Sequence, residues 1–377
     1  MSVIPFFTGA RSIERDWPNL EQRLTEVIAR GQFTYGAVGM ELERAVERFT
    51  GARHAIAVAN GSDAIVILLR AVGIGPGDEV IVPAYTFFST ASSVALVGAE
   101  PVMVDVVSGS YAMDPGAARA AIGPRTKAIM PVHLFSQMAD MAPLRALAAE
   151  HGLLLLEDSA EGIGMFQGGR HAGLHGAGGV LSFFPTKTLG GLGDGGMLLT
   201  DDHAVATAAR RLRAHGAQAE NPDEYVELGY NSRLDELQAA VLLTRLEHLP
   251  ADIAHRAALA AHYDRRLAGL MPAVRTPRLL PTSEPGTQVC YVYLIEARDR
   301  DRLVDHLAEH GIGTETYYPV PVHRQPAFAG RIGTRFPCPT AESASERAVA
   351  LPMYADLAHA DVDYVCDVIL DFYREGP

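Results

Sequence analysis

Lysine is rare in this chain, so each lysine is a candidate for chemistry that arginine cannot perform. Lys127 and Lys187 are the only lysines among 32 Lys and Arg residues. An arginine guanidinium stays protonated in proteins, whereas a lysine amine can lose its proton and act as a nucleophile. Lys127 precedes an apolar run and is most simply a loop charge, but residues 182–191 (SFFPTKTLGG) hold no charge besides Lys187. Lys187 is therefore a candidate for Schiff-base chemistry, and a strand-end lysine that extends to the solvent is the structural alternative.

A turn of small residues, Asn60-Gly61-Ser62-Asp63-Ala64, follows a predicted strand and opens a predicted helix. Small side chains let the backbone approach an anion, and the free N–H groups of a helix N-terminus can bind it. The turn therefore indicates a phosphate site. The alternative is an ordinary helix N-cap provided by Ser62 or Asp63.

Asp158 ends a predicted strand that contains four consecutive leucines. A carboxylate at the C-terminal edge of a buried parallel strand faces the crevice where α/β folds bind ligands. There it would keep a ring nitrogen protonated, as pyridoxal phosphate chemistry requires. A helix cap or a metal carboxylate is the alternative, and a metal is not expected because no His/Asp cluster lies nearby at ligand spacing.

An aromatic pair, Phe87 and Phe88, follows another predicted strand end and would offer a stacking surface to a flat cofactor, although core packing is the alternative. Residues 191–196 (GLGDGG) match the G-x-G-x-x-G pattern but precede a strand. Because no helix begins there, a dinucleotide fingerprint is rejected. We interpret this segment as a flexible turn that carries the chain past Lys187.

Short apolar runs alternate with helical patterns over the first 200 residues, which is typical of an α/β protein with a mostly parallel sheet. Strands are expected at residues 55–59, 79–83, 101–106, 128–133, 153–158, 180–184 and 196–200. Helices are expected at residues 20–30, 39–50, 63–72, 89–97, 115–121, 141–151, 202–215 and 234–247.

The pattern changes after a long helix expected at residues 250–269. A strand at 290–297, a helix at 300–310, a strand at 314–318 and helices at 341–350 and 360–373 then predict a smaller α+β domain. We therefore expect a large domain over residues 1–249 and a small C-terminal domain over residues 250–377. We expect the N-terminal segment to pack on the small domain.

The formal charge of −13 argues against a nucleic-acid-binding surface. The three cysteines are widely spaced and cannot all pair within one chain, which favours a reducing compartment. We expect neither a cleavable leader nor a membrane span, because the first residues lack a basic region followed by a long apolar core and no apolar run approaches 18 residues. A cytoplasmic protein without a membrane partner is expected.

The chain resembles the DegT/DnrJ/EryC1/StrS aminotransferases, which are fold-type I pyridoxal-phosphate enzymes that aminate sugars. The resemblance extends from Phe33 to Tyr354. It is carried by residues 75–80 (GPGDEV), 131–134 (PVHL), 157–160 (EDSA), 182–187 (SFFPTK), 229–233 (GYNSR) and 318–323 (YPVPVH). It implies an aspartate aminotransferase-like fold, a pyridoxal 5′-phosphate cofactor and a homodimer with shared active sites.

The resemblance also implies roles for individual residues. Lys187 would form the Schiff base with the cofactor, Asp158 would pair with the pyridine nitrogen, and Phe87 would stack on the ring. The phosphate would be bound by Gly61, Ser62, the Asp63 backbone, Ser182 and, from the neighbouring subunit, Asn231. Substrate contacts would come from Arg233, Tyr317, Tyr318 and His323.

One residue departs from the family pattern. Many relatives carry Gln or His three residues after the motif aspartate, where it can contact the phenolic oxygen of the cofactor, whereas this chain has Glu161. A carboxylate there would change the protonation balance at Lys187, or it would turn elsewhere.

The substrate implied by the resemblance is a nucleotide-linked ketosugar, with L-glutamate as the amino donor and glutamine as an alternative. The segments Leu189-Gly190 and Gly193-Asp194-Gly195-Gly196 favour members that act at sugar C3. A 4-keto sugar, a cyclitol, or a non-catalytic cofactor-binding protein of the same fold is the alternative.

Overall fold

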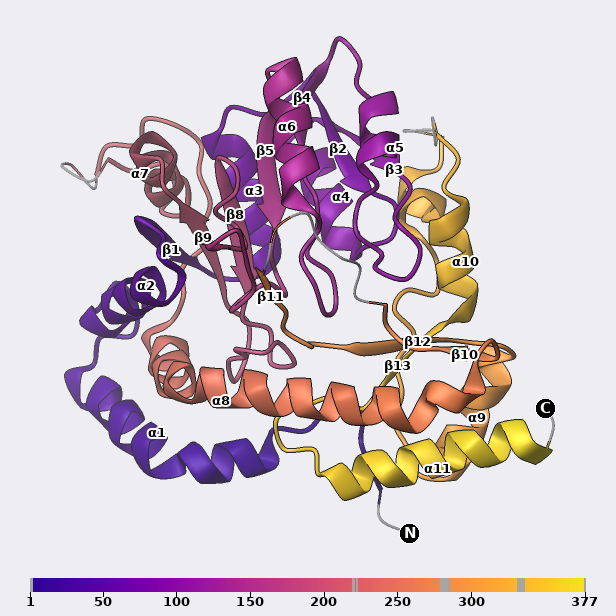
Figure 1. Cartoon of the computed structure of the whole chain (residues 1–377). Helices are drawn as coiled ribbons and strands as arrows, with labels where there is room; N and C mark the ends of the chain where they lie inside the picture. The colour runs from indigo at the N-terminus through magenta and orange to yellow at the C-terminus, as the bar shows by residue number, and fades with distance from the viewer. Residues whose placement is uncertain are drawn as a thin grey trace.

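The computed structural model describes residues 3–218, 221, 223–278, 284, 286–330 and 336–375. Its centre is a seven-stranded sheet (Figure 1). The strands are β1 (His54–Val58), β2 (Glu79–Pro83), β3 (Glu100–Val104), β4 (Thr126–Ile129), β5 (Leu154–Asp158), β8 (Gly178–Ser182) and β9 (Gly196–Thr200). Their order is β1-β9-β8-β5-β4-β2-β3, and β9 alone runs antiparallel to its neighbours. The predicted α/β fold with a mostly parallel sheet is confirmed.

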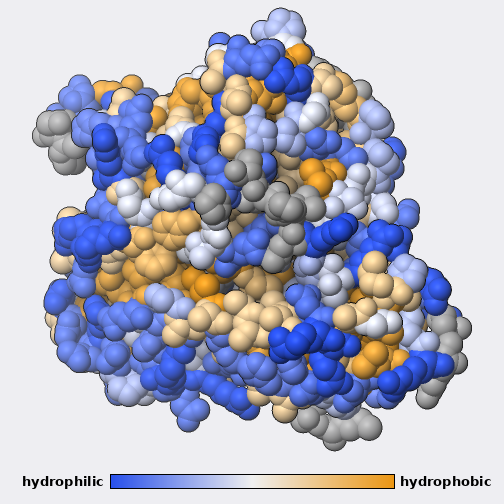
Figure 2. All heavy atoms as spheres, in the orientation of Figure 1, coloured by the Kyte–Doolittle hydropathy of each residue, from blue (hydrophilic) through white to orange (hydrophobic). Residues whose placement is uncertain are grey.

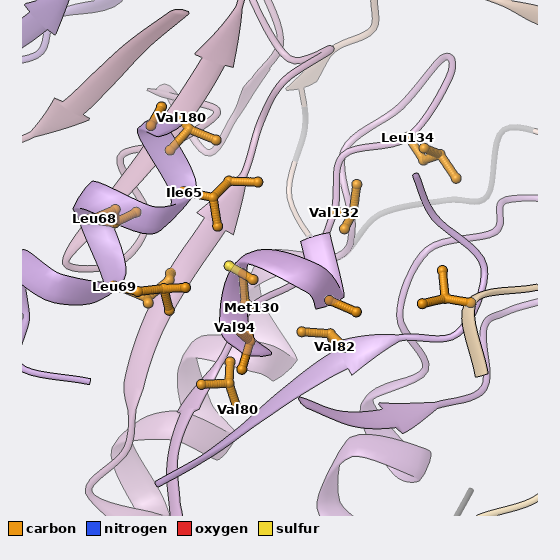
Figure 3. Packing of buried hydrophobic residues seen from close by; sticks show 14 of the residues in the cluster. Ile65, Leu68, Leu69, Val80, Val82, Val94, Met130, Val132, Leu134 and Val180 are labelled. Carbon is orange, nitrogen blue, oxygen red and sulfur yellow. The ribbon is translucent and has the colours of Figure 1, made fainter. Parts of the chain in front are cut away.

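Helices cover both faces of this sheet, because successive side chains of a strand point to opposite faces. Val80 and Val82 of β2 pack in the same core as α3 and α4 (Figure 3). Ile81 packs instead in the core formed with α5 and α6. The covering helices are α2 (Ala37–Thr50), α3 (Gly61–Ala71), α4 (Phe88–Leu96), α5 (Pro115–Ala120), α6 (Met141–His151) and α7 (His203–Leu212).

The carboxyl ends of the parallel strands meet at one edge of the sheet, and several of the predicted site residues lie there. Asp158 is the last residue of β5, and Ser182 is the last residue of β8. Helix α3 begins at the same edge, where Asn60 is the N-cap and its side chain accepts a hydrogen bond from Asp63 N at 2.8 Å. The alternative interpretation of Ser62 or Asp63 as the cap is therefore wrong.

Helix α8 (Glu236–Leu267) is continuous across Pro250, where separate helices were expected. It packs along α1 (Ala10–Arg30), which begins ten residues before its predicted start. The Glu236 carboxylate accepts hydrogen bonds from the backbone N–H groups of Gly36, Val38 and Gly39 at 2.9–3.0 Å. It therefore caps the start of α2 from another element.

The C-terminal part contains a small sheet of order β10-β12-β13 that packs on helices. Its elements are β10 (Val274–Arg275), β12 (Tyr293–Ala297), α9 (Arg300–Glu309), α10 (Pro339–Arg347), β13 (Ala348–Leu351) and α11 (His359–Glu375). Ile4 bridges to Ile312, so the N-terminal segment joins this part. Because α8 runs through residue 250, both predicted domains share it, and the division at 249/250 stays a prediction.

Two C-terminal predictions are wrong. The helix expected at 341–350 ends at Arg347, because residues 348–351 are fully buried and pair with β12, which overrides local helix propensity. The strand expected at 314–318 is a single bridge between Glu315 and Ala350, because Tyr317 and Tyr318 turn instead into an aromatic cluster.

Short elements complete the described part of the chain. They are β6 (Phe166–Gln167), β7 (Arg170–His171), β11 (Gly286–Thr287), and the 3-10 turns η1 (Ala268–Leu270), η2 (Val322–Arg324) and η3 (Pro326–Phe328). Within the described ranges, none of the helices is long and apolar enough to cross a membrane.

Candidate active site

A cavity of about 470 Å³ opens at the carboxyl edge of the sheet. Most of the predicted cofactor and substrate residues line it, although they come from segments far apart in the chain. The predicted residues in its wall are Gly61, Ser62, Phe87, Asp158, Glu161, Ser182, Lys187, Tyr317 and Tyr318. The predicted turn of small residues, Phe87, Asp158 and Lys187 therefore lie at a single site.

Lys187 lies in the irregular loop between β8 and β9, where its backbone N–H closes a turn onto Phe184 O at 2.8 Å. Its Nζ lies 2.9 Å from Glu161 Oε1 and 4.3 Å from the centroid of the Tyr291 ring. Burial alone lowers the pKa of Lys187, but the negative charge of Glu161, with smaller contributions from Tyr291 and Asp158, raises it above its ordinary value. The free amine is therefore held as an ammonium until a ligand replaces this partner.

Glu161 is fixed at both carboxylate oxygens. While Oε1 accepts from Lys187, Oε2 accepts from the backbone N–H of Phe135 at 2.6 Å. Phe135 itself adopts a positive φ of 62°. Of the two orientations open for Glu161 from sequence, the structure therefore shows the one that faces the lysine.

Asp158 is buried and oriented by a threonine that the sequence did not single out. Thr90 Oγ1 donates to Asp158 Oδ2 at 2.6 Å, and Ala160 N donates to Asp158 Oδ1 at 3.2 Å. Thr90 Oγ1 also lies 3.0 Å from Thr86 Oγ1. A short bond from a hydroxyl to a carboxylate is among the stronger protein hydrogen bonds, so Thr90 holds the carboxylate in one orientation.

The neighbouring carboxylate, Glu157, anchors the strand end from behind. It is completely buried and accepts hydrogen bonds from His133 Nε2 at 2.9 Å and from the backbone N–H groups of Gly173, His175 and Gly176 at 2.6–3.1 Å. Burial alone raises the pKa of Glu157, but the His133 bond and these other donors outweigh it and lower the pKa. Glu157 therefore ties β5 to the two loops that surround Asp158.

The start of α3 forms a cradle in the wall of the cavity. Because Asn60 caps the helix, the Ser62 hydroxyl is left to the cavity, where it accepts from Ser89 Oγ at 2.6 Å. A Cβ at Gly61 would lie 3.0 Å from Ser182 Cβ, so a side chain there would crowd the cradle. This arrangement is suited to an anion such as a phosphate.

Aromatic side chains form the opposite wall of the cavity. Phe87 is 60% exposed, and its ring centroid lies 6.3 Å from that of Tyr318. Behind them, the Phe135 ring stacks on Tyr317 with an interplanar angle of 14°. Burial raises the pKa of both Tyr317 and Tyr318, so they stay neutral hydroxyl groups at physiological pH.

The structure does not bring every predicted residue to this cavity. Asn231 is exposed outside it, and Arg233 lies over the Tyr35 ring with its Cζ 5.0 Å from the centroid. His323 is buried and pairs with Glu342 Oε1 at 3.1 Å instead. Asp63 contributes its backbone N–H to the Asn60 cap.

The cavity residues that were missed as site candidates include Thr86, Ser89, Thr186 and Tyr291. Tyr291 follows a predicted strand start, and its OH lies 2.9 Å from Thr186 Oγ1. Thr186 is next to Lys187 in sequence, but nothing local in the sequence indicates that Tyr291 reaches the same loop.

The sequence profile of the DegT/DnrJ/EryC1/StrS aminotransferase family matches residues 16–370. A "Pleiotropic regulatory protein" of Geobacillus stearothermophilus is 42% identical, with 98% of this chain and 99% of that protein covered. A "UDP-N-acetyl-3-dehydro-alpha-D-glucosamine 3-aminotranferase" of Acidithiobacillus ferrooxidans is also 42% identical, with 91% of each chain covered.

Solved structures agree with these relatives. The DesV protein of S. venezuelae, solved "in complex with ketimine intermediate", superposes with a TM-score of 0.93 at 37% identity and covers 98% of each chain. The ntda protein from Bacillus subtilis, solved with bound cofactor PMP, has a TM-score of 0.88 at 30% identity, covering 98% of this chain and 85% of that one.

Proposed function

Because the chain belongs to the DegT/DnrJ/EryC1/StrS aminotransferase family, we propose that it is a pyridoxal 5′-phosphate-dependent sugar aminotransferase. Its proposed substrate is a nucleotide-linked ketosugar, a 3-keto-deoxyhexose, with L-glutamate as the amino donor. The observation that carries the proposal is the convergence of Lys187 and Asp158 on the cavity that also contains the α3 cradle.

The residues present fit pyridoxal phosphate. The cradle at Gly61 and Ser62, with Ser182 beside it, would bind the phosphate, Asp158 would bind the ring nitrogen, and Phe87 would stack on the ring. The cofactor would supply a protonated ring that accepts the electron pair left when a C–H bond is broken.

The chain's own residues would bind and move protons. Lys187 Nζ, once neutral, would accept the proton from the α-carbon of the amino donor. It would then return this proton to the bound molecule from the same side. Thr90 would keep Asp158 oriented toward the ring. Glu161, 2.9 Å from Nζ, would exchange the proton with Lys187 between steps.

Amination at C3 is supported by two observations. The relative from Acidithiobacillus ferrooxidans is named as a 3-aminotransferase. In addition, Asp194 of the Gly193-Asp194-Gly195-Gly196 segment lines the cavity, where its carboxylate could accept a hydrogen bond from a sugar hydroxyl. A 4-keto sugar or a cyclitol is the alternative acceptor.

A homodimer with shared active sites is part of the proposal. Among the described residues that line the cavity, Lys187 is the only cation, yet the donor and the nucleotide are both anionic. Arg233 and Asn231 would enter from the partner subunit.

Figure 2 shows hydrophobic atoms gathered between the lower ends of β8 and β9 and helix α8. Phe184 and Leu192 lie in the loop between β8 and β9 that contains Lys187. Their side chains are 50% and 47% exposed, which suits burial by a second copy of the chain.

The deciding experiment incubates the purified protein, pyridoxal phosphate and L-glutamate with 3-keto and 4-keto nucleotide sugars, and identifies the aminated carbon by NMR. We expect an amine at C3. An amine at C4 alone would overturn the position of amination, and the absence of any amine with either sugar or a cyclitol ketone would favour a non-catalytic role.

A further inference from the structure

The ring of Tyr291 lies against the amine of Lys187. Tyr291 precedes β12 and lies 105 residues after Thr186, the neighbour of Lys187. Lys187 Nζ is 4.3 Å from the centroid of this ring, within the roughly 6 Å over which an aromatic face attracts a cation. Glu161 Oε1 lies 2.9 Å from the same nitrogen. The amine therefore has two partners from different parts of the chain, a carboxylate and an aromatic ring.

The backbone of Phe135 connects these two partners. Its N–H donates to Glu161 Oε2 at 2.6 Å, and its carbonyl accepts from the N–H of Tyr291 at 2.9 Å. One residue therefore fixes the position of the carboxylate relative to the ring. Because both partners are attached to the same residue, the place that they leave for the Lys187 amine is fixed as well.

Tyr291 is held at two further points. Its hydroxyl lies 2.9 Å from Thr186 Oγ1, and its carbonyl accepts from Arg256 Nη1 at 3.2 Å. Arg256 is only 3% exposed and also donates to Met353 O at 2.9 Å. Tyr291 itself is 6% exposed. The ring cannot leave the amine without breaking buried hydrogen bonds, which is unfavourable.

Both partners favour the protonated form of the amine. Burial alone lowers the pKa of Lys187, but Glu161 and, to a smaller extent, Tyr291 raise it above its ordinary value. An aromatic face attracts the positive charge of an ammonium and offers no comparable attraction to a neutral amine. The ring therefore stabilises the form that Lys187 takes after it has accepted a proton.

We propose that Tyr291 is a positioning residue for the amination reaction, whose ring holds the Lys187 amine at the cavity wall and stabilises it once protonated. This inference rests on the proposed function, in which the lone pair of Nζ takes the α-carbon proton of the donor. The electron pair of the broken C–H bond passes to the bound cofactor. The ring acts on the amine, and the hydroxyl only orients the ring through Thr186.

The contact can be observed by NMR because Lys127 and Lys187 are the only lysines. Cofactor-free protein labelled with ¹³C at the lysine ε-carbon should give two ε-methylene signals, and Lys187→Ala assigns them. The current of an aromatic ring shifts protons above its face upfield, so we expect the Lys187 signal upfield of the signal from exposed Lys127. Tyr291→Phe should keep this shift and Tyr291→Leu should lose it. A Lys187 signal that Tyr291→Leu does not move would overturn the proposal.

Steady-state kinetics test the role of the ring. Tyr291→Leu should lower kcat roughly tenfold, the factor expected for loss of a desolvated cation–π contact, with little change in KM. Tyr291→Phe should retain most of kcat, because it keeps the ring. Tyr373→Leu is the matched control and should behave as wild type, since Tyr373 lies on α11, where its hydroxyl donates to Arg298 O. An equal loss of kcat in Tyr291→Phe and Tyr291→Leu would overturn the role of the ring.

The positioning role and the proposed function can fail separately. The NMR signal is measured without cofactor or substrate, so it does not depend on amination. Wild-type protein that aminates no ketone would overturn the proposed function and the role of Tyr291 in it, even with the ring contact present. Amination with a normal kcat in Tyr291→Leu would overturn the positioning role alone. Should Tyr291→Leu not fold, Tyr291→Met, which also lacks a ring, serves in both measurements with the same expected results.

Discussion

Glu161 presents one carboxylate oxygen to Lys187 Nζ at 2.9 Å and the other to the backbone N–H of Phe135 at 2.6 Å. Both carboxylate oxygens therefore accept a hydrogen bond. The Glu161 side chain cannot rotate away from Lys187 without losing a buried hydrogen bond. The contact with Glu161 holds the pKa of Lys187 above its ordinary value.

Replacement of Glu161 should make Lys187 reactive at lower pH. In Glu161→Gln the negative charge is lost while burial remains, so the pKa of Lys187 should fall from its raised value. More of the amine is then neutral at pH 7, and cofactor-free protein should react faster with added pyridoxal phosphate. The pH profile of the rate, followed by absorbance, should move to lower pH. Glu150→Gln, in an exposed pair, should leave the profile unchanged.

The two lysines form a natural pair of variants. Lys187→Ala should lose the lysine-dependent cofactor absorbance and reduce amination by a factor on the order of 10³ or more, because it removes the proton carrier. Lys127→Ala changes an exposed side chain and should leave both unchanged. A normal cofactor spectrum in Lys187→Ala would refute the assignment of the lysine.

Thr90→Val tests the orientation of Asp158. Loss of the 2.6 Å bond should destabilise the protein by about 1–3 kcal/mol and lower kcat, because the carboxylate is left with only the Ala160 N–H. Thermal unfolding and steady-state kcat report the two effects. Thr207→Val, at an exposed hydroxyl that donates to His203 O, is the control and should change neither.

Stability below neutral pH should depend on Glu157. Its pKa is lowered in the folded protein, so its stabilising contribution is present above the unfolded-state pKa and is lost as the pH falls through the folded value. Glu157→Gln should destabilise by about 3 kcal/mol at pH 7 because it breaks a buried network. The variant should also show a flatter dependence of unfolding free energy on pH between about 5 and 3. An unchanged acid limb would show that Glu157 is not the group that titrates.

Shared active sites can be tested by complementation. Lys187→Ala and Asn231→Ala are each expected to be inactive, but mixed subunits would form one intact site per heterodimer. Refolding the two variants together should restore roughly a quarter of wild-type activity, as random pairing of a twofold dimer requires. Activity that never rises above that of either variant alone would show that each subunit carries its own complete site.

The main features of the site could be predicted because they are local to strand ends. Asp158 follows a run of leucines that is buried on both faces, and parallel strands deliver their carboxyl ends to one edge of the sheet. The position of Lys187 at the site could be predicted because no other charged residue lies in residues 182–191. These signals depend on only a few neighbouring residues, so no tertiary contact was needed to recognise them.

Contacts between distant segments could not be predicted in this way. Thr90 and Tyr291 reach Asp158 and Lys187 from segments about 70 and 100 residues away in the chain. The residues 348–351 have the composition of a helix but become a strand because β12 lies beside them. Asn231 and Arg233 lie outside the cavity of a single chain, and only a resemblance to known enzymes suggested them.

The 32-residue helix α8 makes the two halves of the chain interdependent for folding. Leu242 and Leu249 of its first part belong to the core beneath β8 and β9, whereas Leu259 and Tyr263 belong to the C-terminal core. A fragment ending at residue 249 would cut this helix, expose apolar surface and lose the anchor for the C-terminal sheet. We therefore expect that neither half folds alone once the helix is cut at residue 249.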